Sequence, residues 1–300
     1  KEVVDQLTEY DSIVNQFFVP MIIKNFDEPR DKMYKEINTQ KLRLERAKLA
    51  YVDGAFTLDD YKAKAKVIED TIKSLEEKIN TADKFEVFNY SAIINFGVKN
   101  STGDYIIQLN NDTELLTPDW LQEMLGFAQR EDVGAVGVKM YYPDKTIQHA
   151  GIIVGIGGVA GHVFKNIPYN MHGYFSKDAM IQNMSAVTAA CIMAPRKMYE
   201  AVGNMDEKFE VAFNDVDFCL KIREQGKLIV YNPYVQFIHY ESKSRGFEDT
   251  LEKQKRFKGE VERFQNKWKK ILKDGDPYYN INLRLDNDQC AIKPEKVKYN

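Results

Sequence analysis

The sequence of 300 residues is poor in cysteine and contains no long apolar run. Its three cysteines, Cys191, Cys219 and Cys290, are an odd number without close spacing, which argues against a disulfide framework or a zinc knot and favours reduced thiols. The most apolar segment, residues 186–195, has about half of the roughly 20 residues that a membrane-spanning helix needs. The first ten residues carry charges where a secretory signal peptide needs an apolar stretch. We therefore expect a soluble, cytoplasmic protein.

A large excess of charge of one sign is also absent. Lysine and arginine number 42 against 45 aspartate and glutamate residues, so the formal net charge is -3. This balance argues against a general polyanion binder, and we expect no nucleic-acid partner, although local basic pockets for phosphate remain compatible with it. The 44% of hydrophobic residues over this length can bury a sizeable core, in one large domain or two smaller ones.

Glycine is nearly absent from residues 1–83, which instead carry helical periodicity. Apolar residues recur at alternating steps of three and four over residues 58–79, and this spacing is typical of a coiled-coil seam. A comparable stripe covers residues 33–51, and the intervening Asp53-Gly54 pair is a turn signal. We predict a helical arm over residues 1–83, with two antiparallel helices joined near Gly54 and an earlier helix that ends near Pro20.

The turn of this hairpin is followed by the signal of a helix start, since Thr57 stands at an N-cap position with Asp60 three residues later. The run of residues 48–79 resembles the helical hairpin of large serine recombinases, mainly through its heptads and its turn. No recombinase catalytic serine region accompanies it, and residues 1–80 carry a slight negative charge, which disfavours a DNA-binding function. A packing or oligomerising hairpin is the simpler interpretation.

After residue 84 the pattern changes to short apolar runs that alternate with helical stretches and glycine turns. This alternation is typical of an α/β fold, and we assign residues 84–300 to one such domain. The runs that predict strands are residues 105–109, 135–138, 187–194 and 228–231. The stretches that predict helices are residues 118–130, 214–225 and 247–273.

The first polar cluster follows the strand predicted over residues 105–109 and contains Asn110, Asn111 and Asp112. Ligands bind at the carboxyl ends of strands in α/β sheets, so this cluster is placed at the expected edge. A divalent cation held there could bridge the phosphates of a nucleotide and neutralise a leaving group. An ordinary turn and helix cap would have the same residues.

The second cluster places Asp215 and Asp217 at the start of a predicted helix, where the helix dipole stabilises carboxylates. Transfer of a group to an alcohol needs a carboxylate near the acceptor hydroxyl as a general base, and Asp215 is our candidate. Asp217 could orient the helix or the acceptor. Simple N-capping is the alternative for both residues.

The third cluster begins with His239, at the end of an apolar strand, and continues with Ser244 and Arg245. An arginine with nearby hydroxyls favours a phosphate site, although a lone histidine after a strand is more often structural. His149 and His162 lie beside glycine-rich turns, and we interpret them as structural or acceptor-side residues.

The order of several segments along the chain resembles bacterial family 2 glycosyltransferases of the rhamnosyltransferase-like kind, from about residue 85 to residue 290. The segments that carry the resemblance are residues 88–114, 148–162, 185–209, 213–226, 239–246 and 275–285. The resemblance implies a GT-A fold, an inverting mechanism and a nucleoside-diphosphate sugar donor. It also implies a divalent metal, Mn²⁺ or Mg²⁺, and a polysaccharide or glycolipid acceptor.

Mapped onto the family, Asn110 and Asp112 fall on its Asp-x-Asp metal motif, and His239 falls on a histidine that can complete the metal site. Asp215 falls on the catalytic base, and Thr188 falls where the family lines the floor of the active site, on the acceptor side. The first motif position is Asn rather than Asp, which leaves one fewer negative charge at the metal.

The chain departs from the family at its start, because family members begin with a strand–helix–strand unit that binds the nucleotide, and the helical arm stands in its place here. We therefore expect a mixed sheet flanked by helices that lacks this first βαβ unit. Two functions stay open: an inverting glycosyltransferase, impaired if the unit is essential, and a non-catalytic oligomerising scaffold. The arm could form a homo-oligomer, and a glycolipid acceptor would bring the protein to a membrane surface.

Overall fold

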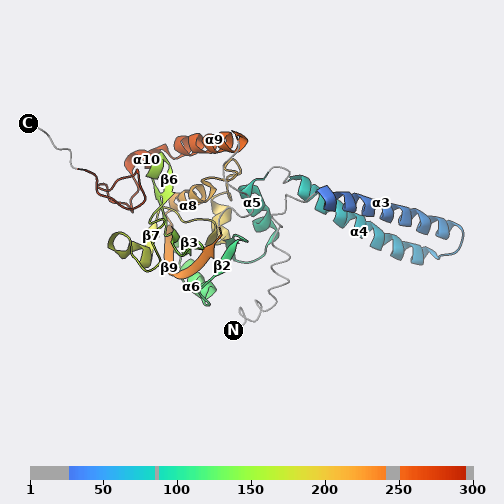
Figure 1. Ribbon diagram of the computed structural model, residues 1–300. Helices are drawn as coiled ribbons and strands as arrows, with labels where there is room; N and C mark the ends of the chain where they lie inside the picture. Colours follow the sequence, from blue (N-terminus) through green and yellow to red (C-terminus); the bar gives the residue numbers. More distant parts are fainter. Residues whose placement is uncertain (1–26, 85–87, 241–250, 295–300) are drawn as a thin grey trace, which may run out of the picture. The chain divides into compact units, whose positions relative to one another are not determined.

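A computed structural model describes residues 27–84, 88–240 and 251–294 (Figure 1). The chain divides into two compact units, one that contains helices α3 (Asp27–Val52) and α4 (Leu58–Lys84) and one that begins at Asn89. Among these described residues, none of the helices combines the length and the apolar character that crossing a bilayer requires. The helix predicted before Pro20 lies outside the described residues.

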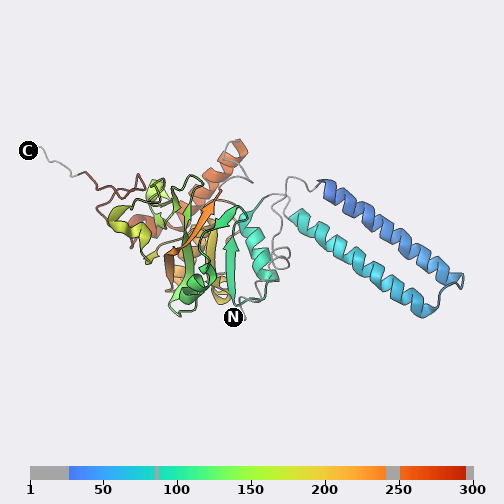
Figure 2. The same cartoon turned by 60° about the horizontal axis from the view of Figure 1, so that its bottom comes forward.

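Helices α3 and α4 form the antiparallel hairpin that the periodicity predicts (Figure 2). The chain reverses at Gly54, whose φ of 76° is easily reached only by glycine. Helix α4 then starts with a capping box, because the Asp60 amide donates to the Thr57 hydroxyl at 3.2 Å and the Thr57 amide donates to the Asp60 carboxylate at 3.3 Å. Along the seam Ala65 is buried, and the Tyr51 and Tyr61 rings stack with centroids 5.4 Å apart.

The second unit is built on a mixed seven-stranded sheet with the strand order β1-β8-β3-β9-β2, to which β4 adds beside β3 and β7 beside β9. Only β3 and β9 are parallel neighbours, and every other pair is antiparallel. The sheet strands are β1 (Tyr105–Leu109), β2 (Thr113–Leu115), β3 (Val133–Tyr141), β4 (Ile147–His149), β7 (Gln182–Met184), β8 (Cys191–Pro195) and β9 (Leu228–His239). A separate small sheet pairs β5 (Ile152–Val154) with β6 (Ala160–His162).

Helices cover both faces of this sheet, because successive residues of the central strand β3 point to opposite sides and both sides are apolar. Val136 packs with Trp120 and Met124 of α6 on one face, whereas Ala135 packs with Phe218 of α8 on the other. Figure 1 shows α6 and α8 on opposite sides of the strands. The helices of this unit are α5 (Tyr90–Asn100), α6 (Trp120–Ala128), α7 (Arg196–Ala201), α8 (Asn214–Glu224), α9 (Leu251–Lys267) and α10 (Lys269–Asp274), with short 3-10 helices η2 (Ile156–Gly158) and η3 (Tyr174–Ala179).

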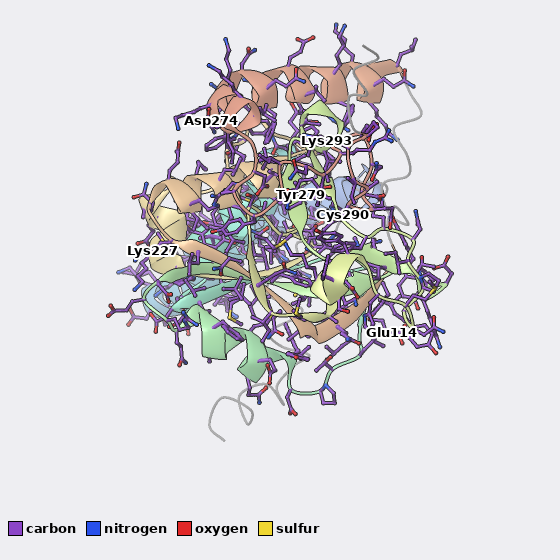
Figure 3. All side chains as sticks on the ribbon, turned by 90° about the vertical axis from the view of Figure 1, so that its left-hand side faces the viewer. Glu114, Lys227, Asp274, Tyr279, Cys290 and Lys293 are labelled. Carbon is purple, nitrogen blue, oxygen red and sulfur yellow. The ribbon has the colours of Figure 1, made fainter. Side chains whose placement is uncertain are left out.

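The expected α/β class and the mixed sheet flanked by helices are thereby confirmed. Strand β1 lies at one edge of the sheet, and no strand precedes it in the described part of the chain. After α10 the chain folds back over this unit, where the side chains of Tyr279 and Cys290 lie next to each other (Figure 3).

One predicted strand was wrong in its first half, since β8 begins at Cys191 rather than at residue 187. The reason is local: the amides of Thr188 and Ala189 donate to the side chains of His149 and Asp215 instead of to a neighbouring strand. The segment just before β8 is therefore available to line a site.

Candidate active site

Three polar side chains meet where β1 and β9 end, and His239 is far in the sequence from the other two, Asn110 and Asp112. The His239 Nε2 atom lies 3.1 Å from Asp112 Oδ1 and 3.3 Å from Asn110 Nδ2. Antiparallel pairing of β2 with β9 aligns Thr113 with His239, and the Tyr240 amide donates to the Asp112 carbonyl at 2.8 Å. The structure therefore brings together all three residues that the sequence predicts as metal ligands.

This group offers a carboxylate oxygen, an imidazole nitrogen and an amide side chain. Among the described residues, no group of three or more His, Cys, Asp or Glu side chains is placed to hold a metal ion. Asp112 and His239 are two such ligands, and Asn110 is the amide beside them. Oxygen and imidazole donors suit Mn²⁺, and Mg²⁺ is commonly held by one or two carboxylates plus the phosphates of a substrate.

The far side of His239 is held by Gln148 of β4, which sequence reasoning missed. The Gln148 Oε1 atom lies 2.7 Å from His239 Nδ1, and its Nε2 donates to the His239 carbonyl at 3.2 Å. Gln148 is only 4% exposed. Both strands adjoin β3 at its end, where Met140 is aligned with His149 of β4 and with Phe237 of β9. In the sequence Gln148 opens one of the segments that carry the family resemblance, residues 148–162, but no periodicity or spacing singles it out within that segment.

The candidate base Asp215 lies at the start of α8, next to the segment that precedes β8. Its Oδ2 atom accepts a hydrogen bond from the Ala189 amide at 3.2 Å, and its Oδ1 atom accepts one from the Val216 amide at 2.8 Å. The residue just before α8, Phe213, has a φ of 60°, which is uncommon outside glycine and marks local strain. This turn sets the direction in which α8 begins.

Tyr90 of α5 lies between the region of Asp112 and the region of Asp215. The sequence analysis did not single it out. Its hydroxyl donates to the Ala189 carbonyl at 3.1 Å and lies 3.4 Å from Asn110 Oδ1. Burial raises the pKa of the Tyr90 phenol, and neighbouring groups including Asp215 add to the rise, so the hydroxyl stays protonated as a donor. The backbone amide of Asn110 in turn donates to the Ala190 carbonyl at 2.9 Å. The Ala189-Ala190 backbone therefore contacts Asp215, Tyr90 and Asn110 together.

Thr188 lies in the same segment, where its backbone amide donates to His149 Nε2 at 3.4 Å. Burial lowers the pKa of His149 well below its ordinary value, and the nearby His162 and His239 lower it further. The ring is therefore neutral, which is the state that can accept this hydrogen bond. The Nδ1 atoms of His149 and His162 are 3.2 Å apart. His149 is fully buried and contacts the segment around Thr188, which favours the structural interpretation of this residue.

Asp217 is not brought to this cluster. Its carboxylate is fully buried and accepts a hydrogen bond from Trp268 Nε1 at 2.9 Å, while Lys267 Nζ lies 2.7 Å from the same oxygen. It connects α8 to α9 and α10, which favours a structural role over the predicted contact with the acceptor. Asn111 is exposed in the loop between β1 and β2. Ser244 and Arg245 lie outside the described residues.

Comparison with known proteins gives a family for this unit. Residues 87–202 match the family model described as "Glycosyl transferase family 2". The chain is 44% identical over 222 residues to the uncharacterized protein y4gI of Sinorhizobium fredii, a match that covers 74% of this chain and 24% of that protein. It is 37% identical over 207 residues to the O-antigen biosynthesis protein RfbC of Myxococcus xanthus, which covers 69% of this chain and 16% of that protein. The chain thus spans a quarter or less of the length of these relatives.

A solved structure described as "GalNAc-T7 with UDP, GalNAc and Mn2+" is similar with a TM-score of 0.46 and 11% sequence identity, over 62% of this chain and 37% of that one. This likeness is too low to bear on function. The similarity of the arm to serine-recombinase hairpins stays a hypothesis. The matched range contains the strand and the polar loop that carry Asn110 and Asp112, and the sheet is mixed and flanked by helices as the resemblance implied. The resemblance to family 2 glycosyltransferases is confirmed, because residues 87–202 of the α/β unit match the model of that family.

Proposed function

We propose that this chain transfers a sugar from a nucleoside-diphosphate sugar to a hydroxyl group of a saccharide or glycolipid acceptor, with inversion at the anomeric carbon. The observation that carries the proposal is the arrangement around Ala189-Ala190. Asp112, His239 and Asn110 form one polar group beside this backbone, and Asp215 contacts it through the Ala189 amide. A donor-binding group and a candidate base therefore share one site.

The first group fits a divalent cation through its donor chemistry. Asp112 and His239 present an oxygen and a nitrogen that are 3.1 Å apart, and the side chain of Asn110 stands beside them. A bound Mn²⁺ or Mg²⁺ would offset the negative charge on the diphosphate leaving group. Because this group has a single carboxylate, the phosphates of the donor would complete the ligand set, and metal and nucleotide should bind together. Ser244 and Arg245, and the exposed Asn111, are proposed to contact the donor.

Asp215 supplies the base. As the acceptor oxygen attacks the anomeric carbon, its proton passes to the Asp215 carboxylate, the new carbon–oxygen bond forms, and the bond to the diphosphate oxygen breaks. The nucleoside diphosphate leaves from the opposite face of the sugar, so the configuration inverts. Thr188, beside Ala189, is proposed to lie on the acceptor side.

The nature of the acceptor rests on one relative. The Myxococcus protein is named for O-antigen biosynthesis, which supports a saccharide or glycolipid acceptor for this chain. Such an acceptor would place the protein in the cytoplasm near a membrane surface, and the hairpin of α3 and α4 is proposed to mediate homo-oligomers. We also propose the division of the chain into a helical arm, residues 1–83, and a catalytic domain, residues 84–300.

A second function, a non-catalytic scaffold, is favoured by one specific observation. Strand β1 lies at the sheet edge, and the described residues contain no strand before it that could bind a nucleotide base. Donor binding separates the two functions, because a scaffold has no use for a nucleotide sugar.

Isothermal titration of the full chain with a panel of nucleoside-diphosphate sugars, with Mn²⁺ or with a chelator, tests the proposal. We expect binding of at least one donor that requires the metal and is lost in Asp112→Asn. Asp119→Asn is the matched control, because Asp119 is an exposed carboxylate beside α6 whose side chain makes no capping hydrogen bond. Equal affinity with and without the chelator would refute the metal site, and no binding of any donor would favour the scaffold.

A further inference from the structure

A single buried glutamine uses both ends of its side-chain amide on one histidine. Gln148 pairs its oxygen with the ring of His239 and its nitrogen with the backbone carbonyl of the same residue. Resting on the proposed function, we propose that Gln148 is a positioning residue. It holds a proton of His239 on Nδ1, so that Nε2 is the ring nitrogen that faces Asp112 and that a divalent cation would bind.

The direction of the Gln148 amide follows from what its partners can do. The carbonyl of His239 can only accept, so the atom 3.2 Å from it must be the amide nitrogen. The amide oxygen therefore faces His239 Nδ1 at 2.7 Å, and because that oxygen can only accept, Nδ1 must donate. In a neutral imidazole the proton on Nδ1 leaves Nε2 with a lone pair. Gln148 thus selects one of the two tautomers.

The other side of the ring has the chemistry that this tautomer requires. Asn110 Nδ2 lies 3.3 Å from Nε2 and can donate to it, but Asp112 Oδ1, at 3.1 Å, can only accept. A lone pair and a carboxylate oxygen at this distance repel each other unless positive charge lies between them, and a second ring proton or a bound cation would supply that charge. Two neighbouring ligands of an octahedral ion with bonds of about 2.1 Å are separated by roughly 3 Å, so the spacing suits a shared cation. Hydrogen bonds of this kind behind a ligating histidine orient its ring and tune its affinity for metal.

A purely structural role is the alternative, in which Gln148 only satisfies buried polar groups of β4 and β9. Two substitutions distinguish the roles. Gln148→Met keeps the length of the side chain but removes both hydrogen bonds. Gln148→Glu keeps an acceptor for Nδ1 and loses the donor to the His239 carbonyl, so a structural role makes it at least as harmful as Gln148→Met. A positioning role predicts instead that Gln148→Glu binds the metal more tightly than Gln148→Met.

The test uses the full chain, with Mn²⁺ affinity measured by electron paramagnetic resonance in the presence and absence of UDP. Ring nitrogen spectra of ¹⁵N-histidine-labelled protein report the tautomer, and four histidines are few enough to assign by substitution. We expect Nδ1 protonation in the parent and a loss of about 10- to 100-fold in Mn²⁺ affinity in Gln148→Met, with most of the affinity restored in Gln148→Glu. Gln182→Met is the matched control, since Gln182 of β7 also donates to a backbone carbonyl, that of Lys177, and should leave both readouts unchanged.

The proposal would be overturned if Gln148→Met kept the parental tautomer of His239 and the parental Mn²⁺ affinity. It would also be overturned if Gln148→Glu bound Mn²⁺ as weakly as Gln148→Met. A His239 ring that carries its proton on Nε2 and not on Nδ1 in the parent would overturn it as well. If the parent binds no Mn²⁺ with or without nucleotide, the metal site of the proposed function fails, and the tautomer of His239 in the parent and in Gln148→Met alone decides the role of Gln148.

Discussion

Replacing Asp215 by asparagine removes the proposed base while keeping most of what the side chain does for the fold. The two oxygens of Asp215 accept from the Ala189 amide at 3.2 Å and from the Val216 amide at 2.8 Å. Asparagine keeps one acceptor oxygen, so one of these hydrogen bonds is lost, at a cost of about 1 kcal/mol. That is small against a total stability of roughly 5–15 kcal/mol, and we expect the variant to fold.

The effect on transfer should be much larger than the effect on folding. Loss of a general base typically lowers the rate by about 10² to 10⁴, which corresponds to about 2.7 to 5.4 kcal/mol in the activation free energy. Donor binding should stay within a few-fold of the parent, since Asp112, His239 and Asn110 form a separate contact group. The variant should therefore bind the donor, fold and fail to transfer.

Asp217→Asn is the comparison that the structure makes informative, and the opposite pattern is expected. Asp217 is fully buried and bonded to Trp268 and Lys267, whereas Lys267 is one-third exposed and also pairs with Asp206 at 3.0 Å. Breaking a fully buried pair costs about 3–5 kcal/mol, and because Lys267 keeps Asp206 and some solvent, about 2–3 kcal/mol is a better expectation. Transfer per folded molecule should change little.

Single-turnover transfer at matched donor occupancy measures the first effect, and urea unfolding followed by circular dichroism measures the second. Transfer at the parental rate in Asp215→Asn would refute its role as the base. If Asp217→Asn instead abolishes transfer without loss of stability, the two carboxylates have been assigned the wrong way round.

Two further changes address the arm and the buried histidine. Ala65→Asp places a charge at the buried seam of α3 and α4 and should cost at least about 3 kcal/mol, seen as lower helicity, whereas Val67→Asp, at a position 67% exposed, should stay within about 0.5 kcal/mol of the parent. Because burial holds the pKa of His149 well below 6.5, the unfolded chain binds a proton below that pH that the folded chain does not. Stability should therefore fall by up to about 1.4 kcal/mol per pH unit as the pH drops below 6.5, and urea titrations should show a shallower decline in His149→Gln. An equal decline in both proteins would refute this account.

The sequence predicted the elements that carry the site better than the contacts between them. The hairpin could be predicted because its signals are local: a stripe of apolar residues, a Gly54 turn and a Thr57 cap all act within a few residues. The rule that ligands bind at the ends of strands also placed Asp112 at the edge of the sheet, and the family resemblance joined His239 to it. It could not predict that β2 would pair with β9 and bring these two side chains to 3.1 Å, because that pairing joins residues more than a hundred positions apart.

Tyr90 and Gln148 show most clearly what could not be predicted from the sequence. Each is a single polar residue with an unremarkable neighbourhood in the sequence, and each gains its role only from partners on other elements. Gln148 reaches His239 because β4 and β9 flank the same end of β3, and Tyr90 reaches Asn110 because α5 packs beside the end of β1. No period or spacing encodes such contacts, since they depend on the tertiary arrangement of the whole sheet.

The choice between Asp215 and Asp217 lies between these extremes. Residues two apart on a helix point in different directions, so at most one of the two carboxylates could face the site, and helical geometry alone cannot say which. The structure decides through the surroundings of α8. On one side the Ala189 amide, next to Thr188, meets Asp215, and on the other Trp268 and Lys267 enclose Asp217. Predicting this from the sequence would require knowing that the junction of α9 and α10 packs on α8, because Lys267 and Trp268 at that junction contact the Asp217 carboxylate and make it a buried structural group.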